Sequence, residues 1–240
     1  MRFGWAWFCP GQSSPFAREV EMNKLLALMC LGSGVTGCGY TDGGGGSRTL
    51  EVQARLEYRA HDNQTDIRID VRKDGAVLDD ANITITDGDT DKRFEIEQNN
   101  PGGEYRDDID GYHRRVELRI ESNSDELNAQ LEGPGIHFVT APANDTVVKR
   151  DDIGDSLEVE WETKDGMAAE EVDVRIHSTG YTKHITNWED PGSADIPSGK
   201  IDEGDEETRV VRRNKVRLDG GTGSSSLEIT YEARNSFLVQ

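Results

Sequence analysis

The sequence predicts an all-β protein whose body consists of two tandem β-sandwich domains. Apolar and charged residues alternate with a period of two over most of the chain after residue 48, which leaves one face of each predicted strand dry. Clusters of Gly, Pro and Asn divide these segments into short, regularly spaced strands. The same pattern begins again after residue 143, so we place the domain boundary between 143 and 144.

The first predicted domain spans residues 48–143 and opens with the clearest strand. Residues 50–58 alternate without interruption, and no helical period fits that run. A Lys73-Asp74-Gly75 turn signal follows the second strand. The residues expected on the buried faces are, strand by strand, Leu50, Val52, Ala54, Leu56 and Tyr58; Ile67, Ile69 and Val71; Ala81, Ile83 and Ile85; Phe94 and Ile96; Val116, Leu118 and Ile120; Leu127, Ala129 and Leu131; and Ile136 and Phe138.

The second predicted domain spans residues 144–240. Strands are expected at 157–161, 172–176, 181–188, 209–218 and 227–239, and the only helical turn is expected at 167–171. The residues expected on its buried faces include Leu157, Val159 and Trp161; Val172, Val174 and Ile176; and Leu227, Ile229, Tyr231 and Ala233.

Short segments in both halves of the chain resemble known β-sandwich families. Leu157-x-Val159-x-Trp161 and Tyr231-Glu232-Ala233-Arg234-Asn235 resemble core positions of immunoglobulin-like and fibronectin type III domains. The resemblance implies that Trp161 fills the space between two sheets and that Tyr231 lies on a late strand. In the first half, residues 75–85 with Gly103-Glu104-Tyr105 resemble the prealbumin-like modules of carboxypeptidase-regulatory domains. The expected fold is therefore two tandem immunoglobulin-like β-sandwiches after a signal peptide and a flexible linker.

Charge excludes one class of partner. The formal net charge is -20, which argues against nucleic-acid binding because polyanions need a basic surface. Such uniform acidity first indicates a solvated surface that keeps the protein soluble and unassociated. No run reaches eighteen apolar residues, so no membrane-spanning helix is predicted in the body.

The N-terminus has the layout of a secretion signal. From Met22 the chain carries one cation at Lys24, an apolar run to Leu31 and small residues up to Cys38. Residues 1–21 lack this character, so translation is expected to begin at Met22. Val35-Thr36-Gly37-Cys38 resembles the bacterial lipobox, which implies removal of residues 1–37 and lipidation of Cys38. The alternative is a chance cysteine in an ordinary signal peptide or a short buried helix.

A Gly-rich segment follows the candidate lipidation site. Residues 38–47 contain four consecutive glycines and would form a flexible tether between the lipid and the folded body. Two or three acyl chains hold a protein durably at a membrane, whereas one does so only marginally. In the lipoproteins that the sequence resembles, an Asp after the cysteine causes retention at the inner membrane. Gly39 stands there, which implies the outer membrane of a two-membrane cell.

Few motifs suggest chemistry. Zinc-protease and nucleophile-elbow motifs are absent, and the histidines have no ligand spacing. Residues 194–200 approach a phosphate-binding loop, but Ile201 replaces the metal-binding hydroxyl, so a turn is predicted. Asp87, Asp89 and Asp91 are the best candidates for calcium ligands, although the full loop motif fails and a polar turn is favoured. We therefore predict no cofactor and no enzyme.

The predicted function is non-catalytic binding or scaffolding at a bacterial cell envelope, with a membrane partner through the lipid and an envelope protein or polysaccharide as a further partner. Two alternatives stay open: a calcium-dependent carbohydrate or protein adhesion module, and a polysaccharide hydrolase that uses paired carboxylates. Trp188 and the loop at 187–192 are candidate contact sites. The cations Arg209, Arg213, Lys215 and Arg217 share one face of a predicted strand, where they could dock onto an anionic surface or pair with acidic neighbours.

Overall fold

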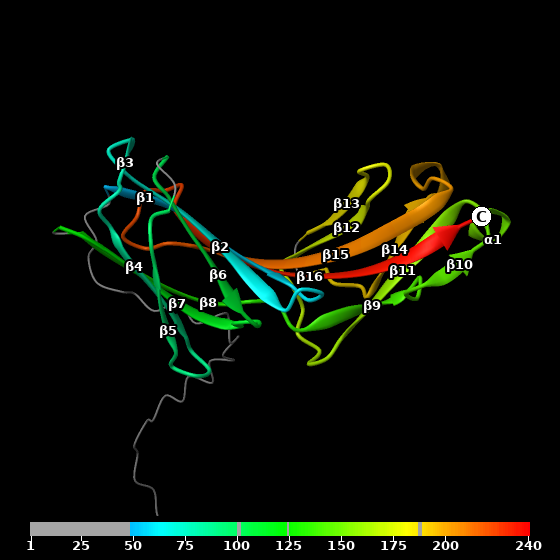
Figure 1. The fold of residues 1–240 in the computed structure, drawn as a ribbon, viewed down its shortest axis with the longest axis horizontal. Helices are drawn as coiled ribbons and strands as arrows, with labels where there is room; N and C mark the ends of the chain where they lie inside the picture. The colour runs from blue at the N-terminus through cyan, green and yellow to red at the C-terminus, as the bar shows by residue number, and fades with distance from the viewer. Residues whose placement is uncertain (1–48, 100–101, 124, 187–188) are drawn as a thin grey trace, which may run out of the picture. The chain divides into compact units, whose positions relative to one another are not determined.

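The computed structural model describes residues 49–99, 102–123, 125–186 and 189–240, and the described chain is almost entirely β (Figure 1). A nine-stranded sheet carries the order β13-β12-β15-β16-β1-β2-β3, with β10 added to β16 and β6 added to β2. Its strands are β13 (Thr182–Ile185), β12 (Glu171–Ile176), β15 (Gly204–Arg217), β16 (Ser226–Val239), β1 (Leu50–Arg59), β2 (Gln64–Lys73), β3 (Ala76–Val77), β10 (Thr146–Val148) and β6 (Glu104–Asp110).

Two smaller sheets pack on this large one. The first has the order β5-β4-β7-β8, and the second has the order β14-β11-β9. Their strands are β5 (Arg93–Ile96), β4 (Asn82–Asp87), β7 (Arg115–Ser122), β8 (Asp125–Glu132), β14 (Ser193–Pro197), β11 (Ser156–Thr163) and β9 (His137–Ala141). The described chain also contains a four-residue helix, α1 (Arg150–Ile153), and a short 3-10 turn, η1 (Ser198–Lys200). None of its helices is long and apolar enough to cross a membrane.

The predicted period of two is confirmed along the long strands. Leu50, Val52, Ala54, Leu56 and Tyr58 on β1 are all buried, and so are Leu227, Ile229, Tyr231 and Ala233 on β16. The β2–β3 turn is also where it was expected. Asp74 and Gly75 have φ values of 51° and 80°, the left-handed conformation of a tight hairpin turn.

The long hairpin β15–β16 contributes to both hydrophobic cores (Figure 1). The first core contains residues from β1, β2, β4, β7 and β8 together with Leu218, Leu227 and Ile229 from the hairpin. The second core surrounds Trp161 and includes Val210, Tyr231 and Phe237 from the same hairpin. The sequence pattern assigns the whole hairpin to the second predicted domain, residues 144–240. In the structure, Leu218, Leu227 and Ile229, around the turn of the hairpin, instead complete the core of residues 48–143.

Pairing between distant strands explains this sharing. β1 pairs in parallel with β16, from Gln53 opposite Ser226 to Arg59 opposite Glu232. Parallel neighbours cannot be joined by a short turn, and more than 160 residues separate these two strands in the chain. The pairing of β1 with β16 therefore joins strands from both sides of the predicted 143/144 boundary into one nine-stranded sheet.

Two local predictions were wrong. The expected inward residues of the last strand of the first half, Ile136 and Phe138, are exposed at 36% and 47%, whereas His137 and Val139 on β9 are buried. Shifting the alternation by one residue exchanges the buried and exposed faces of a strand. The prediction placed the apolar Ile136 and Phe138 inward, whereas the polar His137 is the buried residue. The second error concerns residues 167–171, which form no helix; the short helix is α1 instead.

Candidate functional site

Several predicted functional residues lie outside the described part of the chain. These are Cys38, the signal segment 1–37, the tether 38–47, and Asn187 and Trp188 of the candidate contact loop. The structure does show where the described chain begins. The backbone carbonyl of Leu50 accepts a hydrogen bond of 2.8 Å from the amide of Thr222, so β1 starts beside the turn that joins β15 to β16.

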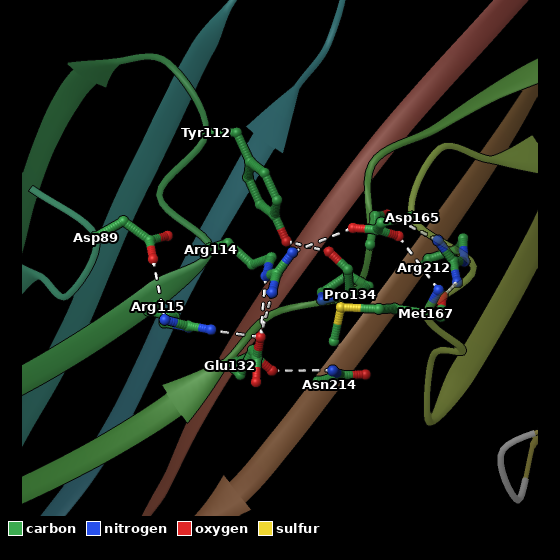
Figure 2. Close-up of polar contacts among 11 residues, drawn as sticks. Asp89, Tyr112, Arg114, Arg115, Glu132, Pro134, Asp165, Met167, Arg212 and Asn214 are labelled. Carbon is green, nitrogen blue, oxygen red and sulfur yellow. Dashed lines mark hydrogen bonds and ion pairs between the residues drawn. The ribbon is translucent and has the colours of Figure 1, made fainter.

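A buried arginine occupies the inward face of β15. Arg212 has no exposed side-chain surface, and its Nε donates to the Asp190 carboxylate over 2.9 Å. Its Nη1 donates to the backbone carbonyl of Gly135 over 2.7 Å, and its Nη2 donates to Asp190. Nη2 also donates to the carbonyl of Met167 (Figure 2). All three nitrogens are therefore hydrogen-bonded, as a buried guanidinium requires.

Asp190 belongs to the loop that the sequence marked as a contact site. Its Oδ1 accepts from Trp161 Nε1 over 2.8 Å, and its Oδ2 accepts from Arg212 and from the Ala169 amide. Trp161 is 3% exposed, which confirms its predicted place between the sheets. A pocket of about 160 Å³ adjoins Trp161 and Asp190. Because the carboxylate is already engaged by these donors, Asp190 holds the loop in place and offers no free oxygen to a ligand.

Four aromatic rings pack beside Arg212. Tyr231 packs against Tyr58, Tyr112 and His137 in tilted or edge-on arrangements, with ring-centroid distances of 4.8, 4.9 and 4.8 Å. Burial, together with the nearby Arg212 charge, lowers the pKa of His137 to about 4. His137 Nε2 lies 3.0 Å from the Val210 carbonyl, and its buried Nδ1 has no partner, so the neutral ring with a proton on Nε2 fits this site. Burial also raises the pKa of Tyr231 to about 12.

Polar contacts link the first smaller sheet to the loop after β11. Arg114, just before β7, donates to Glu132 at the end of β8 over 2.6 Å and to Asp165 over 3.2 Å (Figure 2). Asn214 Nδ2 donates to the Glu132 backbone carbonyl over 2.9 Å, and Tyr112 donates to the Pro134 carbonyl over 2.5 Å. We call this set, with Arg212 and Asp190, the junction network. Because its members mainly form hydrogen bonds and ion pairs with one another, the network stabilises the fold.

The three candidate calcium ligands do not converge. Asp87 is 5% exposed, and its carboxylate accepts from the Asp89 amide, the Thr90 hydroxyl and His113 Nδ1 at 2.8 to 2.9 Å. Asp89 instead forms an ion pair with Arg115 at 3.4 Å. The described residues contain no group of three or more acidic, His or Cys side chains placed to hold a metal ion. The hydrogen bonds to Asp87 make this segment a polar turn.

Three of the four cations predicted on one face of β15, Arg209, Arg213 and Lys215, pair with acidic neighbours, whereas Arg217 forms no ion pair within the described residues. Arg213 contacts Asp173 on β12, Arg209 lies 2.5 Å from Glu207 and 3.7 Å from Glu232, and Lys215 lies 3.9 Å from Glu228 on β16. Asp173 also contacts Arg175 and His184, and these hydrogen bonds and charges keep its pKa below the usual range despite burial. Cross-strand pairing, one of the two hypotheses for this stripe, is therefore what these contacts show.

An open groove of about 410 Å³ lies at the far end of the hairpin. It is lined by the first residues of β15, the last residues of β16, the start of β10 and the loop after β12, namely Asp205, Glu206, Glu207, Ser236, Phe237, Leu238, Asp145, Thr146, Val147 and His177. The sequence analysis missed this groove because it is assembled from four separate segments. In the sequence, the run Asp202-Glu203-Gly204-Asp205-Glu206-Glu207 marks one of these segments as strongly acidic.

Comparisons with known proteins place few constraints on function. The chain matches no protein-family profile and no curated protein sequence. Among solved structures, it is similar to a Ca²⁺-stabilized adhesin that helps an Antarctic bacterium bind ice, with 13% identity and a TM-score of 0.27 over 80% of this chain and 49% of the other. It is also similar to the FN1–FN3 domains of chicken CNTN1, with 9% identity and a TM-score of 0.27 over 75% and 63% of the two chains.

The chain thus spans about half the length of the adhesin structure and 63% of the CNTN1 structure. At these TM-scores the likenesses carry no functional argument. The all-β sandwich architecture rests on the sheet order and the two cores described above.

Proposed function

We propose that the protein is a lipid-anchored, non-catalytic binding or scaffolding component of a bacterial cell envelope. The observation that carries this proposal is the sequence at the N-terminus, where an apolar signal segment ends at Val35-Thr36-Gly37-Cys38 and a Gly-rich tether follows. This arrangement would leave Cys38 as the mature first residue, held at the outer membrane by its acyl chains.

The described body supports a role in binding. Its buried polar groups are engaged within the fold: Arg212 pairs with Asp190, and His137 Nε2 lies 3.0 Å from the Val210 carbonyl. The groove at the end of β15 and β16 is open to solvent. A folded body with an open groove, carried on a flexible tether, suits capture of a partner near a membrane.

The entry point of β1 fits attachment by a tether. Leu50 begins β1 beside the β15–β16 turn, and β16 then continues parallel to β1 and beyond it. Ser236 to Leu238 lie ten to twelve residues after Ser226, which at about 3.3 Å per residue places the groove roughly 35 Å from the start of β16. A partner could therefore reach the groove without displacing the tethered end.

The proposal is tested by intact mass measurement of the chain expressed in a bacterium that processes lipoproteins. The wild type is expected to begin at Cys38 and to carry the added mass of acyl chains. Cys38→Ala should remain uncleaved and lose the lipid, whereas Cys30→Ala, inside the removed segment, should leave the mature mass unchanged. A wild-type mass without lipid, or equal masses for Cys38→Ala and wild type, would overturn the anchor.

A further inference from the structure

Three asparagines stand two residues before a threonine, with no proline between them. The three motifs are Asn63-Gln64-Thr65, Asn82-Ile83-Thr84 and Asn144-Asp145-Thr146. Asn-x-Ser/Thr is the acceptor motif of N-linked glycosylation, a modification of the surfaces of secreted proteins. The motif alone does not tell the three asparagines apart, but their surroundings in the fold do, because all three lie within the described residues.

The first motif is closed by the turn that contains it. Asn63 lies between β1 and β2 with a φ of 53°, and its Oδ1 accepts from the Tyr58 hydroxyl over 3.1 Å. Thr65 is 2% exposed, and its hydroxyl donates to the Gly111 carbonyl over 2.6 Å. A transferase that has to contact the threonine would therefore have to open this part of the fold.

The third motif is held by hydrogen bonds within its loop. Asn144 is exposed, but its Oδ1 accepts from the Ser236 amide over 3.0 Å and its Nδ2 donates to Asp145 over 2.7 Å. The Thr146 hydroxyl donates to the Ala143 carbonyl over 2.6 Å. Both groups that a transferase would contact are therefore already engaged.

The second motif is open. Asn82, the first residue of β4, is exposed, and Thr84 lies on the same face because side chains two residues apart in a strand point the same way. Ile83 and Ile85 fill the first core from the opposite face. Within the described residues, neither the Asn82 amide nor the Thr84 hydroxyl forms a hydrogen bond.

Asn82 also lies at the margin of its sheet. It pairs with Glu121 on β7, whereas pairing with β5 begins one residue later, at Ile83. Residues 78–81, just before it, belong to no strand. The acceptor nitrogen is therefore presented where a loop enters the sheet.

The surface around this motif is charged. The residues opposite Thr84 are Glu95 on β5 and Arg119 on β7, and both are exposed. A sugar attached to Asn82 would therefore extend over polar surface and leave the packing of the core unchanged.

We propose that Asn82 is an N-glycosylation site, with an oligosaccharide linked to a lipid phosphate or diphosphate as the co-substrate. Asn82 Nδ2 forms a bond to the anomeric carbon of the sugar, and the bond from that carbon to the phosphate oxygen breaks. The lipid phosphate leaves with the bonding electrons, and Nδ2 loses one proton to a base of the transferase. The inference rests on the proposed function, because the motif serves as an acceptor in exported chains.

Glycosylation of the folded full chain in vitro tests the proposal. A purified oligosaccharide transferase and its lipid-linked oligosaccharide are added, and intact mass is measured. We expect a gain of one glycan. Asn82→Gln and Thr84→Val should abolish the gain, whereas Thr84→Ser, which keeps the hydroxyl, should retain it. Asn63→Gln and Asn144→Gln make the same amide change in the two closed motifs and should match the wild type.

Peptides separate the motif from the fold. Peptides of residues 59–69, 78–88 and 140–150 carry the three motifs without the surrounding structure, and all three should be modified. In the folded chain, Asn82 should be modified roughly tenfold faster than the other two asparagines, because their motifs must first break hydrogen bonds. A folded chain that gains no glycan, a gain that persists in Asn82→Gln, or equal modification of the three motifs would each overturn the proposal.

The lipid anchor and the glycan are tested separately. The assay needs no export, so Cys38→Ala should accept the glycan as well as the wild type does. A chain that lacks lipid and accepts the glycan would overturn the anchor alone. A lipidated chain that gains no glycan would overturn this inference alone.

Discussion

Arg212 on β15 and Asp190 in the loop before β14 form an ion pair in which the two side chains are 0% and 4% exposed. The pair lies next to Trp161 and connects three segments, because Arg212 also reaches the carbonyls of Gly135 and Met167. A guanidinium is suited to this position because its fork of donors can serve several acceptors at once. The ion pair therefore fixes the loops around the second core.

Removal of the arginine should be strongly destabilising. Arg212→Met leaves Asp190 buried without a cation and should lower the free energy of unfolding by about 3–5 kcal/mol. Arg212→Lys keeps the charge but loses the fork, so an intermediate loss is expected. Urea unfolding followed by Trp fluorescence measures both, and a loss below about 1 kcal/mol for Arg212→Met would contradict this assignment.

His137 should make stability depend on pH between about 4 and 6.5. Its pKa is about 4 when folded, below the ordinary histidine value of 6.5, so in this range the unfolded chain binds more protons and acidification favours unfolding. The stability contributed by neutral His137 should fall by roughly 3 kcal/mol from pH 6.5 to pH 4. His137→Gln should remove this part of the slope, whereas exposed His177→Gln should keep it; identical slopes for His137→Gln and wild type would be the opposite result.

Asp87 should stabilise the fold while its carboxylate is ionised, and this contribution should be lost when the carboxylate is protonated at low pH. Burial raises the pKa of Asp87, but hydrogen bonds from His113, the Asp89 amide and Thr90 outweigh it and hold the pKa below the ordinary aspartate value of 3.8. Its contribution is therefore present above the unfolded value and is lost as pH falls through the folded one. Asp87→Asn should cost about 1–3 kcal/mol at pH 7. Urea unfolding at pH 7 and pH 3 tests this, and an equal cost at both pH values would contradict it.

The corrected phase of β9 gives a matched pair of variants. Val139→Ala, at a position 7% exposed in the second core, should lower the free energy of unfolding by about 2 kcal/mol. Phe138→Ala removes a larger side chain that is 47% exposed, and should change stability by less than about 0.5 kcal/mol. Thermal or urea unfolding measures both variants. A larger loss of stability for Phe138→Ala than for Val139→Ala would indicate that Phe138, and not Val139, faces the core.

Local periodicity was enough to predict most of the strands and their buried faces. β1 and β2 alternate between buried and more exposed residues because one face of each is covered by apolar neighbours, whereas residues 226–233 of β16 are all buried. It failed at His137 and Arg212, whose inward position depends on hydrogen-bond partners far away in the chain. The Arg212 signal was present, since Val210, Arg212 and Asn214 occupy one face of β15, but its pairing with Asp190 is a tertiary fact.

Sheet topology was beyond the same reasoning. The parallel contact of β1 with β16 and the groove formed by β10, β15 and β16 join segments that carry no mutual sequence signal. Conversely, the candidate lipidation of Cys38 rests on sequence alone and stays a prediction.

The central structural claim is that the hairpin β15–β16 completes both cores, and urea unfolding of a fragment containing residues 48–143 tests it most directly. This fragment lacks Leu218, Leu227 and Ile229 and leaves one edge of β1 unpaired. We predict that it shows no cooperative transition and no dispersed amide resonances, while the full chain unfolds cooperatively. A fragment with a sigmoidal transition and a dispersed spectrum would show that residues 48–143 fold alone, and would contradict the claim.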